Sequence, residues 1–285
     1  MNESTKQQID VIVARLAATA QRYPFVRAER LPAIALLTAT RMPNWPTEDP
    51  LLIGPRQMLW GFALDDLSDD WSVSLNVLLA RYATLRAVVG GALPPQGDGL
   101  AEMLCELVAD LHTRPLWPQL ADTWRASFGD LLTGMAAERD PIPPASVEEY
   151  MAHAHLSIGA MQDSWTLFLL VGDVASLPQL PIITSALRAE ARVIRFSNDL
   201  NSAERERLEG KQNALTVFAS QGYGDGRAAT EAALEQALAT YRHAIAQVHT
   251  RTGRFEQCID LTVDAAMAFY QHSTFHEFKH REVGA

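Results

Sequence analysis

The chain of 285 residues contains no stretch in which apolar and polar residues alternate between turn-forming residues, the pattern of a half-buried strand. Its apolar residues instead recur at helical spacing, as Ile9, Val13, Leu16 and Ala20 do near the N-terminus. No repeat and no long linker is present, so we expect residues 1–285 to form one all-α domain around a central apolar cavity. The segments that interrupt the helices are rich in proline or glycine: residues 42–56, 91–99 and 140–146.

We expect the helices to occupy the apolar, periodic stretches between these breaks. Gly159 falls in the middle of the segment 146–171, where a glycine costs about 1 kcal/mol relative to alanine. Pro178 and Pro181 precede the helix that carries residues 198–206. The other predicted helices span residues 4–21, 31–41, 55–69, 72–90, 99–112, 117–138, 146–171, 213–220, 226–251 and 254–278.

A polar motif lies in the segment 192–211. Asn198, Ser202 and Glu206 are spaced four residues apart, so on a helix their side chains share one face. Amide, hydroxyl and carboxylate oxygens are hard donors of the kind that Mg²⁺ accepts. Arg195 and Arg205 flank this face with positive charge, which suits a ligand that bears phosphate groups. The alternative is a solvated helix surface rich in glutamate and arginine.

A second motif is acidic and follows an apolar run, in the sequence WGFALDDLSDDW at residues 60–71. Asp65 and Asp69 are four residues apart, as are Asp66 and Asp70, and like charges at this spacing repel on a helix. The cluster therefore needs a compensating cation or a very wet site. An acidic helix end is a poor alternative, because acids favour helix N-termini and here the apolar run comes first.

The chain is acidic overall, with a formal charge of −10 and a predicted pI of about 5.3. No basic stripe appears, so we do not expect nucleic acid as a partner. Cys105 and Cys258 lack metal or redox spacing and indicate a reducing compartment. The N-terminus is polar, and no uncharged apolar run approaches the ~20 residues that cross a bilayer. We therefore expect a soluble, cytoplasmic protein that does not contact a membrane.

The two motifs together resemble the metal-binding motifs of class I terpene synthases. Asp-Asp-x-x-Asp at residues 65–69 is similar to the first, and Asn-Asp-x-x-Ser-x-x-x-Glu at 198–206 is similar to the second. Their order, and their separation of about 130 residues, also fit that family. The resemblance covers roughly residues 25–278 and implies a single-domain helical bundle with both motifs at the opening of its cavity. It also implies three Mg²⁺ ions and a prenyl diphosphate substrate that is ionised with their help.

The resemblance assigns roles to individual residues. The implied metal ligands are Asp65, Asp66 and Asp69 from the first motif and Asn198, Ser202 and Glu206 from the second. The implied diphosphate contacts are Arg195, Arg205 and Lys211.

A carbocation formed in such an enzyme needs a dry cavity, and aromatic faces stabilise cations by about 2 kcal/mol when desolvated. Gly159 could mark a helix break at that cavity, and Asp163 could then orient a late cation or a water molecule. A cap or a buried hydrogen bond is the alternative role for Asp163. Four aromatic residues lie on the helices expected to line the cavity, with core packing as the alternative for each: Trp60, Phe62, Trp165 and Phe168.

Two stretches, residues 149–172 and 198–215, resemble plant ent-kaurene synthases beyond the metal ligands. The first shares Glu-Tyr-Met at its start and Val-Gly at its end, and the second shares Glu-Gly-Lys at residues 209–211. This resemblance implies a labdane-related diterpene synthase that ionises a bicyclic copalyl-type diphosphate. The chain lacks the Asp-x-Asp-Asp motif of class II cyclases, so a separate class II diterpene cyclase would supply that substrate. The size resembles that of bacterial members, and a homodimer is also compatible with the family.

The sequence departs from bacterial sesquiterpene cyclases at two places. Where many of them carry a diphosphate-sensing arginine, this chain has Ala154 and His155, which weakens a farnesyl diphosphate assignment. The C-terminal Arg-Tyr pair of those cyclases is absent, and three histidines at helical spacing stand there instead. These histidines could form a basic lid over the diphosphate or a zinc-binding face, with a solvated helix as the alternative: His272, His276 and His280.

Other functions remain as alternatives. The same fold could serve a cyclase of linear geranylgeranyl or farnesyl diphosphate. A prenyl-chain elongase fits less well, because it would carry a second Asp-rich motif. A non-catalytic helical scaffold is the alternative of a different class, and the intact set of six metal-binding positions argues against it.

Overall fold

The computed structural model describes residues 3–140 and 142–272, and within this part of the chain it contains helices, turns and loops but no strand. The prediction of an all-α fold is confirmed. None of the described helices combines the length and apolar character needed to cross a membrane. The helices are α1 (Glu3–Arg22), α2 (Leu31–Arg41), α3 (Trp45–Glu48), α4 (Ile53–Ser68), α5 (Leu75–Val89), α6 (Gly99–Leu111), α7 (Trp117–Ala137), α8 (Val147–Ser157), α9 (Ala160–Val171), α10 (Leu180–Glu209), α11 (Ala214–Ser220), α12 (Arg227–Ile245) and α13 (Arg254–His272), with short 3-10 turns at Ala28–Arg30 and Val174–Gln179.

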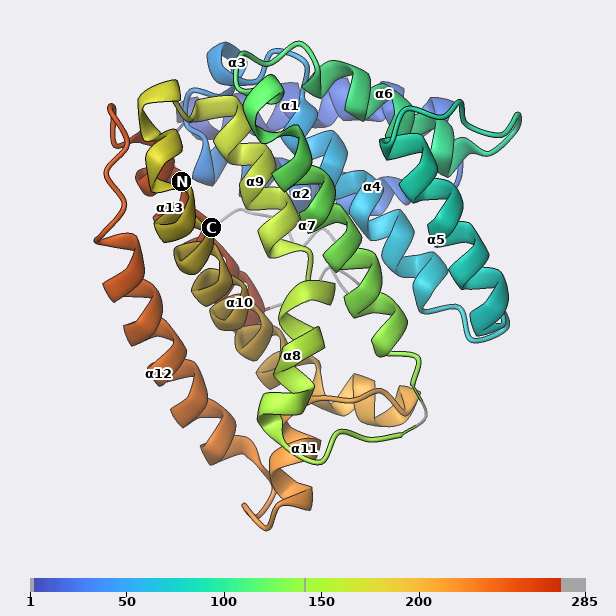
Figure 1. Ribbon diagram of the computed structural model, residues 1–285, viewed down its shortest axis with the longest axis vertical. Helices are drawn as coiled ribbons and strands as arrows, with labels where there is room; N and C mark the ends of the chain where they lie inside the picture. The colour runs from blue at the N-terminus through green and yellow to red at the C-terminus, as the bar shows by residue number, and fades with distance from the viewer. Residues whose placement is uncertain (1–2, 141, 273–285) are drawn as a thin grey trace.

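The longest helix, α10, is the organising element of the bundle. It packs against α8, α9, α11, α12 and α13, and Figure 1 shows α12 running beside it. Helix α7 lies between α8 and α9 on one side and α5 on the other, and α4 packs against α2, α6 and α9. Segments far apart in the sequence thus meet around one interior.

Local capping explains where several helices begin. The Ser74 hydroxyl accepts a hydrogen bond from the N–H of Val77 at the start of α5, and Asp98 caps α6 in the same way. The Ser146 hydroxyl caps α8 by accepting a hydrogen bond from the N–H of Glu149. The glutamate side chain accepts from the N–H of Ala145.

The segment predicted as one helix over residues 146–171 is two helices. Gly159 lies between α8 and α9 with a φ of 75°, a left-handed conformation that residues with a side chain rarely adopt. This glycine ends α8 and lets α9 start in a new direction. The predicted loop at 42–56 also contains the short helix α3 and the first residues of α4.

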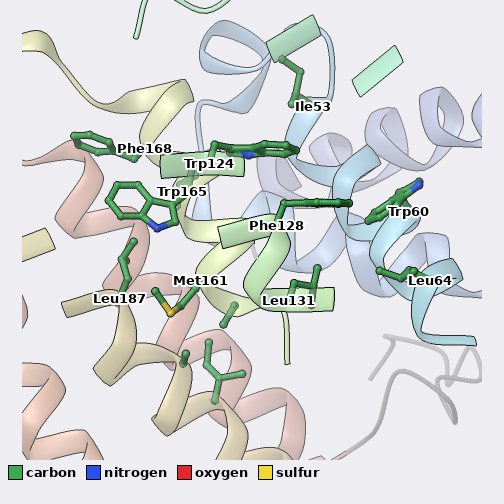
Figure 2. Close-up of a cluster of buried hydrophobic side chains, with 14 of the residues drawn as sticks. Ile53, Trp60, Leu64, Trp124, Phe128, Leu131, Met161, Trp165, Phe168 and Leu187 are labelled. Atoms are coloured by element: carbon green, nitrogen blue, oxygen red, sulfur yellow. The ribbon is translucent and has the colours of Figure 1, made fainter. Parts of the chain in front are cut away.

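The core is built from large side chains packed between the helices. The rings of Trp124 and Phe128 on α7 stack with centroids 5.8 Å apart, and Trp60 on α4 approaches the Phe128 ring to 5.7 Å (Figure 2). Helices α7 and α8 pack so closely at Gly134 that a methyl group there would lie 2.6 Å from the backbone nitrogen of Ser157. This tight core fixes the walls of the cavity described next.

Candidate active site

A cavity of about 250 Å³ lies inside the bundle, far larger than the ~10–15 Å³ that one water molecule needs. Residues from α2, α4, α7, the α8–α9 break, α10 and α13 line it. Its walls are largely apolar, and both sequence motifs reach it. The apolar lining includes Leu37, Met58, Leu131, Met135, Ile194 and Phe269.

The acidic motif lies at the C-terminal end of α4, where Asp65 and Asp69 both line the cavity. Burial, together with the charge of Asp69, raises the pKa of Asp65 to about 7. The ammonium group of Lys211 forms an ion pair with Asp69 and another, at 3.1 Å, with Glu209. The predicted need for a compensating cation at the acidic motif is thus met, in this structure, by the lysine that follows the second motif.

Asp66 occupies a different place from the one predicted. Its two carboxylate oxygens accept hydrogen bonds of 2.9 Å and 2.8 Å from Arg30, and Arg27 approaches to 3.1 Å. It does not line the cavity but an outer hollow beside it, which Asp69, Arg205 and Lys211 also line. Asp66 is thus paired with two arginines outside the cavity, and its role as a metal ligand stays a prediction.

The second motif lies on α10, and its members differ in their positions. Asn198 and Glu206 line the cavity, while Ser202 is fully buried behind them. The Ser202 hydroxyl lies 2.9 Å from the backbone oxygen of Asn198 and 3.4 Å from its amide oxygen. Glu206 accepts a hydrogen bond of 2.7 Å from the Asn213 amide. The three residues follow one another along α10 at the predicted spacing, but only Asn198 and Glu206 reach the cavity, whereas Ser202 is buried.

Arg195 lines the cavity and is held by groups that the sequence did not connect to it. Its guanidinium lies 2.7 Å from Glu138 and 2.8 Å from Asp199, and it donates to the Tyr150 hydroxyl at 2.8 Å. Burial opposes its charge, but Asp199, Tyr150 and Glu138 together keep the pKa of Arg195 well above its ordinary value. Burial also raises the pKa of Asp199 to about 7. The positive charge at this position is therefore permanent.

Arg205 lines both the cavity and the outer hollow. Its nearest carboxylates, Glu206 and Glu209, lie 3.7 Å and 3.6 Å away, beyond hydrogen-bond distance. Its Nε atom is buried and has no hydrogen-bond partner among the described residues. An unpaired guanidinium N–H beside two oxygen-rich motifs suits an anionic ligand.

The two residues that directly follow α7, Glu138 and Arg139, hold the two motifs. Glu138 binds Arg195 on α10 and accepts a 2.6 Å hydrogen bond from Ser157. Arg139 donates to three backbone oxygens of the turn that follows α4, those of Ser68, Asp70 and Val73, at 2.6, 3.2 and 2.6 Å. The end of α7 thus joins the acidic motif to the second motif.

The predicted cavity residues divide into two groups. Trp60, Phe62, Gly159 and Asp163 line the cavity. Trp165 and Phe168 do not: they pack in the core with their rings 6.1 Å apart, on the side that Figure 2 shows near Leu187, and their predicted role in the cavity is corrected. Of the three C-terminal histidines, the side chain of His272 and the whole of His276 and His280 lie outside the described residues.

Several polar residues of the cavity belong to no sequence motif and were not predicted. The guanidinium of Arg41, at the end of α2, binds both carboxylate oxygens of Asp163. Gln57 and Gln162 also line the cavity, and both polar atoms of the Gln162 amide are buried without a partner in the described chain. An arginine that ends an otherwise apolar helix is the signal that could have pointed to Arg41, because a charged residue is rarely buried without a partner.

The donors of the two motifs are carboxylate, amide and hydroxyl oxygens, which fit Mg²⁺. Within residues 3–140 and 142–272, no three His, Cys, Asp or Glu side chains converge as a ready metal site. Lys211 and Asn213 instead hold Asp69 and Glu206. The site thus combines a carboxyl group of raised pKa, that of Asp65, with a guanidinium Nε–H that has no hydrogen-bond partner among the described residues, that of Arg205.

Comparisons with known proteins agree with this geometry. The family model described as "Terpene synthase family 2, C-terminal metal binding" matches residues 56–249. The chain is 28% identical to ent-pimara-9(11),15-diene synthase of Streptomyces sp. (strain KO-3988), over 73% of this chain and 72% of that protein. It is 25% identical to ent-isokaur-15-ene synthase of Oryza sativa subsp. indica, over 51% of this chain but 18% of that longer protein.

Solved structures extend the likeness to the whole bundle. Linalool/nerolidol synthase from Streptomyces clavuligerus superposes with a TM-score of 0.77 at 13% identity, covering 92% of this chain and 95% of that one. At this identity the likeness speaks for the fold alone. With the family model matching two thirds of the sequence, and diterpene synthases among its relatives, the chain belongs to the terpene synthase family and is a terpene synthase.

Proposed function

We propose that this enzyme is a Mg²⁺-dependent class I diterpene synthase that ionises a bicyclic copalyl-type diphosphate. The observation that supports this proposal most strongly is that both oxygen-rich motifs reach one apolar cavity, which the cations Arg205 and Lys211 also line. The apolar walls suit the hydrocarbon, and the charged end suits its diphosphate. The whole of residues 1–285 would form this one catalytic domain.

Asp65 and Asp69 would hold Mg²⁺ on one side of the site, and Asn198 and Glu206 on the other. The resemblance to class I enzymes suggests three ions. Bound there, the metal would neutralise the leaving group as the carbon–oxygen bond ionises. Asp69 would have to release Lys211, which could then turn to the diphosphate together with Arg205. Ser202 would serve by fixing the orientation of Asn198 from behind.

Three observations favour a copalyl-type substrate over a linear one. Two relatives are named for ent-pimaradiene and ent-isokaurene, and residues 149–172 resemble ent-kaurene synthases. Where the sesquiterpene cyclases place a diphosphate-sensing arginine, Ala154 is buried in the core and His155 bonds to the Met151 backbone. A separate class II cyclase would supply the bicyclic diphosphate. The carbocation would be cyclised or rearranged to a hydrocarbon or an alcohol, which the enzyme then releases.

The test is a product assay on purified protein. Farnesyl, geranylgeranyl and the copalyl diphosphate isomers are offered in parallel with Mg²⁺, and products are identified by gas chromatography–mass spectrometry. We expect a polycyclic product from one copalyl isomer. Turnover of a linear diphosphate alone would refute the substrate class and keep the terpene synthase chemistry, while diphosphate release that persists after chelation would refute the metal dependence.

A matched pair of variants tests the site itself. Glu206→Gln changes a carboxylate that lines the cavity, and Glu204→Gln makes the same change two residues away, at an exposed glutamate paired with Arg207. We expect Glu206→Gln and Asp65→Asn each to lower turnover at least ten-fold, with the helical content of both variants unchanged. Glu204→Gln should keep wild-type turnover. Equal activity of all three variants would contradict the assignment of the motifs.

A further inference from the structure

The cavity contains an ion pair that the ionisation step does not use. Arg41, the last residue of α2, binds both oxygens of Asp163 in the first turn of α9, and both residues line the cavity. The Arg41 side chain is only 4% exposed, whereas that of Asp163 is 18% exposed. The carboxylate is thus held in place from behind and remains open to the cavity.

This pair lies away from the metal-binding residues. The Arg41 guanidinium also contacts the Met58 sulfur at 3.3 Å, and Met58 precedes Asp65 by seven residues on α4, about 10 Å along the helix axis. A substrate whose diphosphate lies at Asp65 and Asp69 would therefore place hydrocarbon beside Asp163. The released diphosphate would remain at the other end.

The surroundings of Asp163 suit contact with a cation. The neighbouring amide of Gln162 is buried with neither polar atom hydrogen-bonded within the described chain. A carboxylate oxygen in an apolar wall favours positive charge beside it, because little solvent screens the interaction. By contrast, the bidentate pair of Glu48 and Arg254 joins α3 to α13 and does not line the cavity. An ion pair that only joins two helices can therefore lie outside the cavity, so that role alone does not explain why Asp163 lines it.

We propose that Asp163 is the base that ends the cation cascade, an inference that rests on the proposed function. A C–H bond next to the cationic carbon breaks, and its electron pair forms a carbon–carbon double bond with that carbon. The proton moves to the Asp163 carboxylate, leaving a neutral alkene and a neutral carboxylic acid. The acid returns its proton to solvent when the product leaves. Arg41 is a positioning residue that fixes the carboxylate toward the cavity.

The experiment compares product spectra and diphosphate release for Asp163→Asn and for the double variant Arg41→Met/Asp163→Asn. The double variant removes both charges, so that no unpaired charge stays buried if the single variant fails to fold. Glu48→Gln is the matched control, since it weakens a bidentate arginine–carboxylate pair elsewhere. Wild-type protein is assayed first; if it releases no diphosphate, the proposed function fails before the base is tested.

We expect the folded Asp163 variants to release diphosphate at a rate within about ten-fold of wild type, because the base acts after ionisation. Their main wild-type alkene should fall by at least five-fold relative to other products, replaced by an isomeric alkene or a water-quenched alcohol. Glu48→Gln should keep the wild-type product spectrum. An unchanged spectrum in the Asp163 variants, or loss of diphosphate release from a folded double variant, would overturn the proposal.

Discussion

Glu190 gives a prediction about stability that can be worked out from its surroundings. This residue of α10 is fully buried, and its only hydrogen bonds in the described chain come from the Ser164 hydroxyl, at 2.9 Å and 2.8 Å to its two oxygens. Burial raises its pKa from 4.5 to about 8, the Ser164 hydroxyl lowers it, and the charge of Asp163 raises it further. The folded protein therefore keeps this carboxyl protonated at neutral pH.

The raised pKa makes stability depend on pH with a defined sign. The folded state holds the proton more tightly than the unfolded chain, so the stabilisation is complete below about pH 4.5 and is lost as the pH rises toward about 8. Each pH unit in this window corresponds to about 1.4 kcal/mol, so up to about 3 kcal/mol is lost by pH 7. Glu190→Gln removes the titration and keeps an oxygen for the serine.

The assay is urea unfolding followed by circular dichroism between about pH 5 and about pH 8. We expect Glu190→Gln to gain stability over wild type as the pH rises, with a slope approaching 1.4 kcal/mol per unit. Glu235→Gln, the same change at an exposed position of α12, is the matched control and should follow wild type. A difference between Glu190→Gln and wild type that stays constant with pH would refute the reasoning.

Three further predictions concern the cavity and the end of α7. Gln162→Met should raise the free energy of unfolding by about 1–2 kcal/mol, because it removes two unsatisfied buried polar atoms; a loss of stability in urea melts would contradict this. Gly134→Ala should cost about 1–3 kcal/mol, because the new methyl meets the Ser157 nitrogen at 2.6 Å, whereas Gly129→Ala, with nothing within 4 Å, should gain about 0.5–1 kcal/mol. Arg139→Met should raise the half-saturating Mg²⁺ concentration at least three-fold with a smaller change in kcat, measured as metal-dependent diphosphate release; an equal loss in both would point to general misfolding.

The helices were predictable because their signals are local. Apolar periodicity and proline breaks placed α2 at residues 31–41 and α6 within one residue of its observed end. The break at Gly159 was harder, because the apolar pattern continues on both sides and only the backbone conformation separates α8 from α9. A glycine inside such a pattern can remain helical at modest cost, so the sequence alone does not decide the matter.

The candidate site was predictable only in its ligand types. The spacing of Asp65, Asp69 and Asn198 predicted oxygen donors on shared faces, and the structure places these residues at one cavity. Spacing does not reveal which face meets the cavity, so it did not show that Asp66 lines the outer hollow beside it. It also carries no information on pairs such as Arg41 with Asp163, which are 122 residues apart. Such partners follow from tertiary packing.

The adjacent residues at the end of α7 make the chain sensitive to length at this point. Glu138 holds α10 and Arg139 holds the turn after α4, so a single peptide unit spans the two halves of the site. A substitution at either position disturbs one half. An inserted or deleted residue within α7 would instead rotate both side chains by about 100° and detach the two halves together. Length changes in α7 should therefore abolish turnover where point changes only weaken it.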